Sequence, residues 1–113
     1  MRGGPYVPDR GDLVWLTFDP QAGREPAGRR PALVMSPLAY NRRAGLALVC
    51  PVTSRHKGYP FEVLLPEGLA ISDAILVDHL RSADWTARRA EFIARVPAEF
   101  VTEAIERLRP LLA

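Results

Sequence analysis

The sequence predicts a mainly β domain, arranged as a small antiparallel barrel or half-barrel with one C-terminal helix. Two observations support this fold class. Short apolar segments alternate with polar loops up to residue 96, and from Pro97 onward the apolar residues recur at helical spacing instead. A chain of 113 residues is the size of one domain with one modest core. We therefore expect residues 1–113 to form a single domain.

The first strand is expected at residues 13–18, LVWLTF, because aromatic and β-branched side chains favour strands. Alternation divides it into two faces, with Leu13, Trp15 and Thr17 on one and Val14, Leu16 and Phe18 on the other. Asp19 and Pro20 end the run. The loop that follows, up to Arg30, is longer than a usual hairpin connection, and such loops are more often functional.

Further strands are expected where apolar runs are bounded by turn residues. They cover residues 32–36, 46–52, 61–65, 74–80 and 90–96. Pro51 within the third run indicates a bulge or an edge position. Residues 37–45, PLAYNRRAG, are polar and are expected to form a loop.

The C-terminal helix is expected to begin near Pro97, a residue that suits a first helical turn. Its apolar stripe consists of Phe100, Val101, Ala104, Ile105, Leu108, Leu111 and Leu112. Glu103 and Arg107 form an i, i+4 pair on its surface. Pro110 is expected to fray the last turn.

Composition sets limits on the class of protein. Apolar residues make up 48% and charged residues 25% of the chain, which is ordinary for a globular protein, and no apolar run approaches the length of a membrane helix. A single cysteine, Cys50, excludes an internal disulfide and fits a cytoplasmic location. The net charge of +2 is uneven, at +5 for residues 1–60 and −3 for residues 61–113. The basic first half is compatible with a polyanionic partner or with uneven surface charge of no function.

The segment EPAGRRPALVMSP, residues 25–37, is the leading candidate for a functional site. It combines a carboxylate, Glu25, with two neighbouring cations, Arg29 and Arg30, just before a buried strand. A guanidinium presents a fork of donors that matches phosphate oxygens. Solvated surface arginines in a turn are the alternative interpretation.

Other charged or hydroxyl-bearing groups fall at strand ends, around residues 42–43, 53–57 and 78–81. Spacing alone does not say whether they meet in space. His56 and His79 are isolated, so no metal site and no cofactor is expected, and no phosphate loop or nucleophile elbow is present.

Five sequence motifs of the chain resemble those of the MazF/PemK (Kid) family of toxin endoribonucleases, near its MazF branch. The segment YVPDRGDLVWLTFDP resembles the family's opening strand, and GREPAGRRPALVMSP resembles its E-x-x-G-x-R-P-A block. YNRRAG, CPVTS and KGYPFEV are similar to the next three blocks in order and spacing.

The resemblance implies an SH3-like barrel that acts as a homodimer. It implies metal-independent, sequence-specific cleavage of single-stranded RNA or mRNA, with 2′,3′-cyclic phosphate and 5′-hydroxyl ends and with inhibition of translation and growth. The RNA recognition sequence that the resemblance suggests is one that contains ACA. The implied partner is a MazE-like antitoxin whose disordered tail covers the RNA site.

Carried over by motif, the resemblance implies the following roles. The catalytic residues are Glu25, Arg30 and Thr53, and the RNA-binding residues are Phe18, Arg29, Ser54, Lys57, Asp78, His79 and Arg81. The chain departs from the family's pattern at three places. Arg29 stands where relatives often have His, and His79 stands where Gln usually follows the Asp that Asp78 matches. The turn at residues 66–73 also differs in sequence from the family's turn. A barrel module that binds nucleic acid or a protein target without cutting RNA, similar to a gyrase poison, is the alternative.

Overall fold

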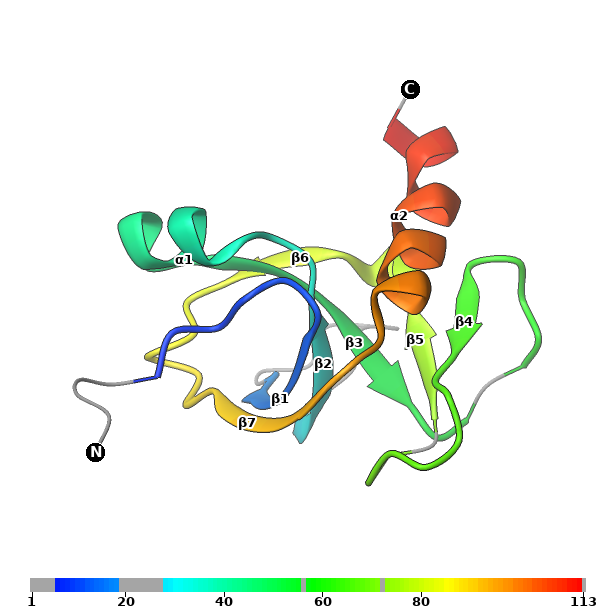
Figure 1. The fold of residues 1–113 in the computed structure, drawn as a ribbon, viewed down its shortest axis with the longest axis horizontal. Helices are drawn as coiled ribbons and strands as arrows, with labels where there is room; N and C mark the ends of the chain where they lie inside the picture. The colour runs from blue at the N-terminus through cyan, green and yellow to red at the C-terminus, as the bar shows by residue number, and fades with distance from the viewer. Residues whose placement is uncertain (1–5, 19–27, 56, 72, 113) are drawn as a thin grey trace.

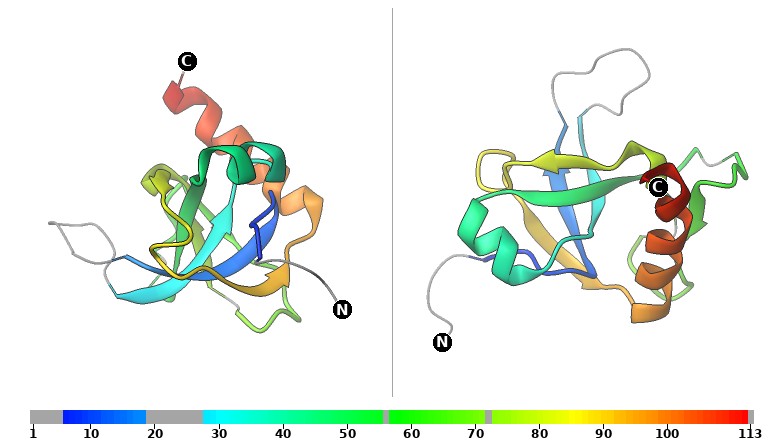
Figure 2. Two further views of the ribbon diagram at one scale, coloured as in Figure 1. Left: turned by 90° about the vertical axis from the view of Figure 1, so that its left-hand side faces the viewer. Right: turned by 90° about the horizontal axis from the view of Figure 1, so that it is seen from above.

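The computed structural model describes residues 6–18, 28–55, 57–71 and 73–112. A strongly bent antiparallel sheet carries one short helix near its N-terminal strands and a longer C-terminal helix (Figures 1 and 2). The elements are β1 (Asp12–Thr17), β2 (Arg29–Val34), α1 (Leu38–Ala44), β3 (Ala47–Thr53), β4 (Glu62–Leu64), β5 (Ala74–Leu76), the 3-10 helix η1 (Val77–His79), β6 (Arg81–Ala83), β7 (Glu91–Arg95) and α2 (Ala98–Leu112). The mainly β, barrel-like fold class with a C-terminal helix is confirmed, although the sheet is not closed.

The sheet runs in the order β4-β5-β3-β2-β1-β7, and β6 also pairs with β3. Along one side, β3 pairs first with β6, at Ala47 to Val49, and then with β5, at Val52 and Thr53. Pro51 lies between these two paired stretches in an inner strand, so the prediction of an edge position is wrong. A residue without an N–H is tolerated there because the ladder on that side is already interrupted.

Two apolar clusters lie on the two faces of the strands. The first contains Leu13, Leu33, Cys50 and Val52 and is covered by α2. The second contains Val14, Leu16, Phe18, Ala32, Val34 and Val49. Neighbouring residues of one strand belong to different clusters, which confirms the alternation predicted for the first strand, except that Trp15 is 36% exposed.

Residues 38–44 form helix α1, so the loop predicted for residues 37–45 is wrong. One buried side chain anchors the helix: Asn41 donates to the backbone carbonyl oxygens of Pro8 and Ser36 and accepts from the Ser36 hydroxyl. Gly45 ends the helix with a φ of 71°, a conformation that glycine adopts at little cost. The remaining residues are mostly exposed, which is why the segment looked like a polar loop.

The strand predicted at residues 74–80 is instead β5, the turn of η1 and, from Arg81, the separate strand β6. The chain turns at η1, where the Leu80 amide donates to the Val77 carbonyl. The apolar run did not reveal this break, because Ala74, Ile75 and Val77 are buried throughout. The turn leaves Asp78 exposed and His79 half-buried at the surface.

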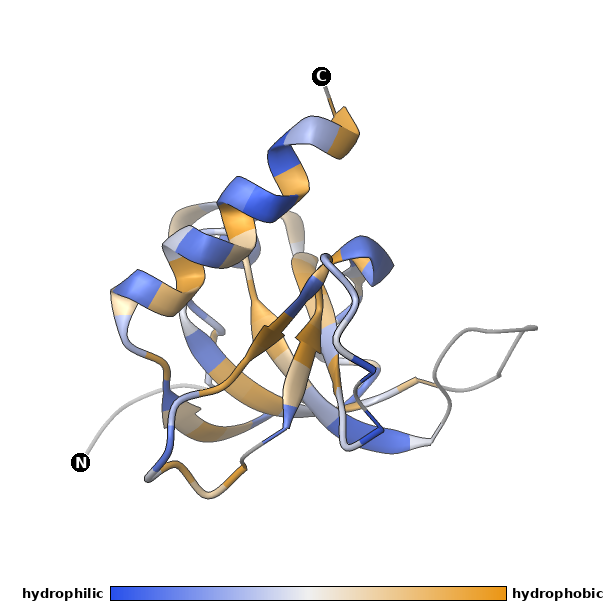
Figure 3. Cartoon of the chain, turned by 90° about the vertical axis from the view of Figure 1, so that its right-hand side faces the viewer, coloured by the Kyte–Doolittle hydropathy of each residue, from blue (hydrophilic) through white to orange (hydrophobic). Residues whose placement is uncertain are grey.

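Helix α2 packs its apolar stripe on the first cluster, with Val101 and Ala104 buried (Figure 3). It continues through Pro110 to Leu112, so the expectation of a frayed last turn is not met. The predicted pair is present, since Arg107 Nη2 lies 2.8 Å from Glu103 Oε2. Among the described residues, no helix has the length and apolar character that crossing a membrane requires.

Candidate functional site

Strands β2 and β3 bring Arg30 and Thr53 to the same end of the sheet. The two strands pair from Val34–Val49 to Ala32–Pro51, and Arg30 and Thr53 each lie two residues beyond that last pair. Alternation puts both residues on the face that carries the second cluster. A cation and a hydroxyl therefore lie at the rim of an apolar core, on rigid strands and not on loops.

Arg81 adds a second guanidinium to this rim. It pairs with Val49 in the ladder between β6 and β3, and its guanidinium carbon lies 5.6 Å from the centre of the Phe18 ring. Phe18 is fully buried, so its ring supports Arg81 by a cation–π contact and does not offer a free face to a base.

A groove of about 720 Å³ opens beside Thr53. Its lining residues are Thr53, Arg55, Lys57, Tyr59, Glu62, Leu76, Asp78 and His79. The Lys57 ammonium lies 5.8 Å from the centre of the Tyr59 ring, and the Thr53 hydroxyl oxygen accepts from the Arg55 amide at 3.1 Å. The groove combines two cations, two carboxylates, an aromatic ring, a hydroxyl and an imidazole. Cations beside an aromatic ring are the groups that proteins use to bind single-stranded nucleic acids.

Four of the residues predicted for the site thus meet in this groove, namely Thr53, Lys57, Asp78 and His79. Ser54 is exposed at the end of β3, next to the groove. Glu25 and His56 lie outside the described residues.

Arg29 is held elsewhere. As the neighbour of Arg30 on a strand, it points to the opposite face. Its guanidinium donates to the Thr17 hydroxyl, to the Arg89 carbonyl and, at 2.7 Å, to a carboxylate oxygen of Glu91. The two adjacent arginines of the sequence motif are therefore separated, and Arg29 ties β2 to the β7 edge.

Four groove residues were not among the predicted site residues: Arg55, Tyr59, Glu62 and Leu76. Arg55, Lys57 and Tyr59 alternate along the chain after β3. Alternate residues share a side only in extended backbone, and Gly58, with a φ of 76°, interrupts it here, so the spacing did not predict this grouping. Nothing in the spacing marked Glu62.

Cys50 is a core residue. Burial, with a smaller contribution from the charge of Asp78, raises the pKa of its thiol to about 12, and its Sγ contacts the Val77 carbonyl oxygen at 3.7 Å. A thiol in this state is a poor nucleophile and metal ligand. Within the described ranges, no three His, Cys, Asp or Glu side chains are grouped as metal ligands would be.

The bent antiparallel sheet and its C-terminal helix define a small β-barrel-like protein with a polar groove at the end of the central strands. The comparisons with known proteins refine this class. A family model described as the PemK-like, MazF-like toxin of type II toxin–antitoxin systems matches residues 9–112. The chain belongs to this toxin family.

Several relatives are close. The endoribonuclease toxin MazF of Escherichia coli K12 is 51% identical over 85 residues, which is 75% of this chain and 76% of the relative. The endoribonuclease toxin ChpB of the same strain is 37% identical over 110 residues, 92% of this chain and 93% of the relative.

Solved structures agree with these relatives. The crystal structure of MazF from Deinococcus radiodurans superposes with a TM-score of 0.92 at 59% identity, covering 96% of this chain and 98% of that one. A MazE–MazF crystal structure from the same organism superposes with a TM-score of 0.87, also at 59% identity, and covers 96% of this chain and 97% of that one.

Proposed function

We propose that this chain is the toxin of a type II toxin–antitoxin system and acts as an endoribonuclease on single-stranded RNA, including mRNA. Its family membership and its relatives named as endoribonucleases support this assignment. The observation that carries the proposal for the site is that Arg30 and Thr53 each lie two residues beyond the last pair of β2 and β3, with Thr53 lining a groove that also holds Arg55 and Lys57. We take residues 1–113 as one toxin domain.

In the proposed reaction, the 2′-oxygen of a ribose attacks the adjacent phosphorus. Arg30 stabilises the negative charge that develops on the phosphoryl oxygens, and the Thr53 hydroxyl helps to hold the phosphate. Glu25, assigned by its motif, accepts the proton of the 2′-hydroxyl. His79, in the same groove as Thr53, or a water molecule protonates the leaving 5′-oxygen.

The products of this reaction are a 2′,3′-cyclic phosphate and a 5′-hydroxyl, and the chemistry needs no metal ion. Lys57 and Arg81 neutralise flanking phosphates, and Phe18 acts through Arg81. Ser54 and Asp78 offer hydrogen bonds at the edge of the groove. Arg29, which is bound to Glu91, contributes to RNA binding from the neighbouring edge.

We further propose that the toxin works as a homodimer in the cytoplasm, where mRNA is its substrate. Cleavage there inhibits translation and growth. A MazE-like antitoxin covers the groove, and the Deinococcus MazE–MazF complexes support this choice of partner. An ACA-containing recognition site is proposed.

The test is cleavage of a long defined RNA in EDTA, with mapping of cut positions and end groups. We expect the wild-type protein to cut at one short motif, and Arg30→Ala to lose about 10²–10³ in kcat while its thermal unfolding is unchanged. Undiminished cutting by the variant would remove Arg30 from the mechanism. Salt-dependent binding of intact RNA by the wild type would instead favour a module that binds without cleaving.

A further inference from the structure

Two backbone amides of the segment that carries Lys57 and Tyr59 donate hydrogen bonds to the carboxylate of Glu62. The Lys57 amide donates to Glu62 Oε1 at 2.9 Å and to Oε2 at 3.2 Å, and the Gly58 amide donates to Oε1 at 2.8 Å. Two consecutive amides thus converge on one carboxylate. Hydrogen bonds to an ionised acceptor are roughly twice as strong as neutral ones.

The backbone at Gly58 makes this convergence possible. Its φ of 76° lies in the left-handed region, and successive N–H groups point into one concavity when such a residue follows a right-handed one. Concavities of this kind bind anions. Here the anion is a side chain of the protein, so the Glu62 carboxylate helps to hold the loop, together with the bond from the Glu62 amide to the Tyr59 carbonyl oxygen.

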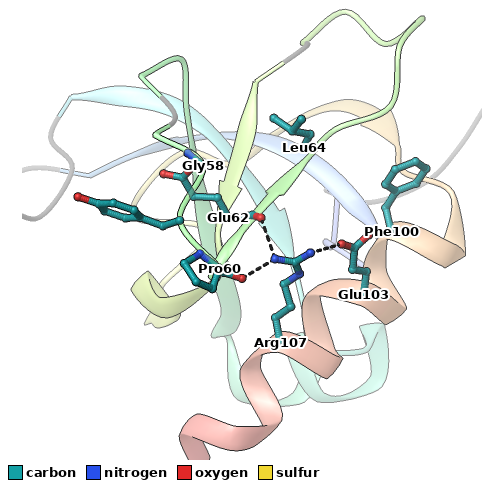
Figure 4. A pocket seen from close by; sticks show the side chains of 8 residues that line it. Gly58, Pro60, Glu62, Leu64, Phe100, Glu103 and Arg107 are labelled. Carbon is teal, nitrogen blue, oxygen red and sulfur yellow. Dashed lines mark hydrogen bonds and ion pairs between the residues drawn. The ribbon is translucent and has the colours of Figure 1, made fainter.

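Helix α2 contacts the backbone of Glu62 and of nearby Pro60 through Arg107. Arg107 donates to the backbone carbonyl oxygens of Pro60 and Glu62 and pairs with Glu103 (Figure 4). Glu62 lies on the wall shared by the groove and a second hollow of about 510 Å³ under α2. The carboxylate therefore connects a fixed part of the fold to the exposed loop.

We propose that Glu62 is a positioning residue for RNA binding, which holds the loop at residues 57–60 so that Lys57 points into the groove. Lys57 has a flexible stem, and its side chain is exposed, so its backbone and the Tyr59 ring set where the ammonium lies. Without Glu62, the two amides are left to water and the loop gains conformations that do not direct Lys57 toward a phosphate. This inference rests on the proposed RNA site.

The test compares Glu62→Ala, Glu62→Gln, Lys57→Ala and the double variant Glu62→Ala/Lys57→Ala. Each is assayed for kcat and KM on a short RNA that contains the mapped cut site, and for thermal unfolding. Glu106→Gln is the matched control, because that glutamate is exposed on α2 and pairs with Arg109. Wild-type cleavage is measured first, so that failure of the proposed function is seen separately.

We expect Glu62→Ala and Lys57→Ala each to raise KM about tenfold, as for one lost phosphate contact, with kcat within about threefold. The double variant should be no worse than either single variant, because both changes remove the same interaction. Glu62→Gln should stay within about threefold of wild type, since the one oxygen Oε1 already accepts from both amides.

Three results would overturn the proposal while leaving RNA cleavage itself intact. The first is a wild-type KM in Glu62→Ala. The second is a double variant whose KM is the product of the two single effects. The third is a Glu62→Gln variant that fails as badly as Glu62→Ala.

Discussion

Replacing Asn41 by alanine should strongly destabilise the fold. The side chain is fully buried and makes three hydrogen bonds, two to the carbonyl oxygens of Pro8 and Ser36 and one from the Ser36 hydroxyl. Each bond contributes about 1 kcal/mol net, and buried partners left unsatisfied cost more. Alanine has a higher helix propensity than asparagine, which offsets the loss in the free energy of unfolding by about 0.5 kcal/mol. We therefore expect a loss of about 3 kcal/mol.

For 113 residues, an unfolding entropy of about 2.1 cal/mol/K per residue converts that loss into a fall in Tm of about 12 °C. The measurement is thermal unfolding by circular dichroism at fixed protein concentration, because association would shift Tm. Arg43→Ala, on the exposed side of the same helix, is the control and should change the free energy of unfolding by less than about 0.5 kcal/mol. A loss below about 1 kcal/mol for Asn41→Ala would refute this account of α1.

Two further predictions concern single side chains. Because burial raises the pKa of Cys50 from 9.0 to about 12, its thiolate fraction at pH 8 is about 10³-fold below that of an ordinary thiol, and iodoacetamide should label the native protein at least that much more slowly than the denatured one. The free energy of unfolding should also fall as the pH rises above 9.0, because the thiol ionises first in the unfolded state. Arg29→Ala should lower kcat/KM less than tenfold in the cleavage assay, because Arg29 faces Glu91. Arg30→Ala should lower it by about 10²–10³. Equal losses in the two variants would place both arginines on the same phosphate.

Periodicity was a reliable guide where one face of an element is buried along its whole length. The strand around Val14 and Leu16 and the helix around Val101 and Ala104 have this property, and both were predicted. Helix α1 lacks it, since Asn41 is its one buried residue among those described. A short helix fixed by a single polar side chain leaves no apolar period to detect.

The candidate site was predictable in its residue types but not in its arrangement. The sequence placed Arg29 and Arg30 at the end of a loop that runs up to Arg30, whereas β2 begins at Arg29 and so directs the two arginines to opposite faces. That Arg30 and Thr53 lie at the same end of the sheet depends on strand register, and register is set by long-range packing that no local pattern contains. Glu62 was missed for a similar reason, because its partners are backbone amides.

The change of partner along β3 has a consequence for how the site is held together. Arg30 belongs to the part of the sheet formed by β1, β2 and the first half of β3, whereas Thr53 pairs with β5 beyond Pro51. The position of Thr53 relative to Arg30 therefore depends on the course of β3 across Pro51. A ligand that binds between the two halves of the sheet would change the distance between Arg30 and Thr53 without contacting either side chain.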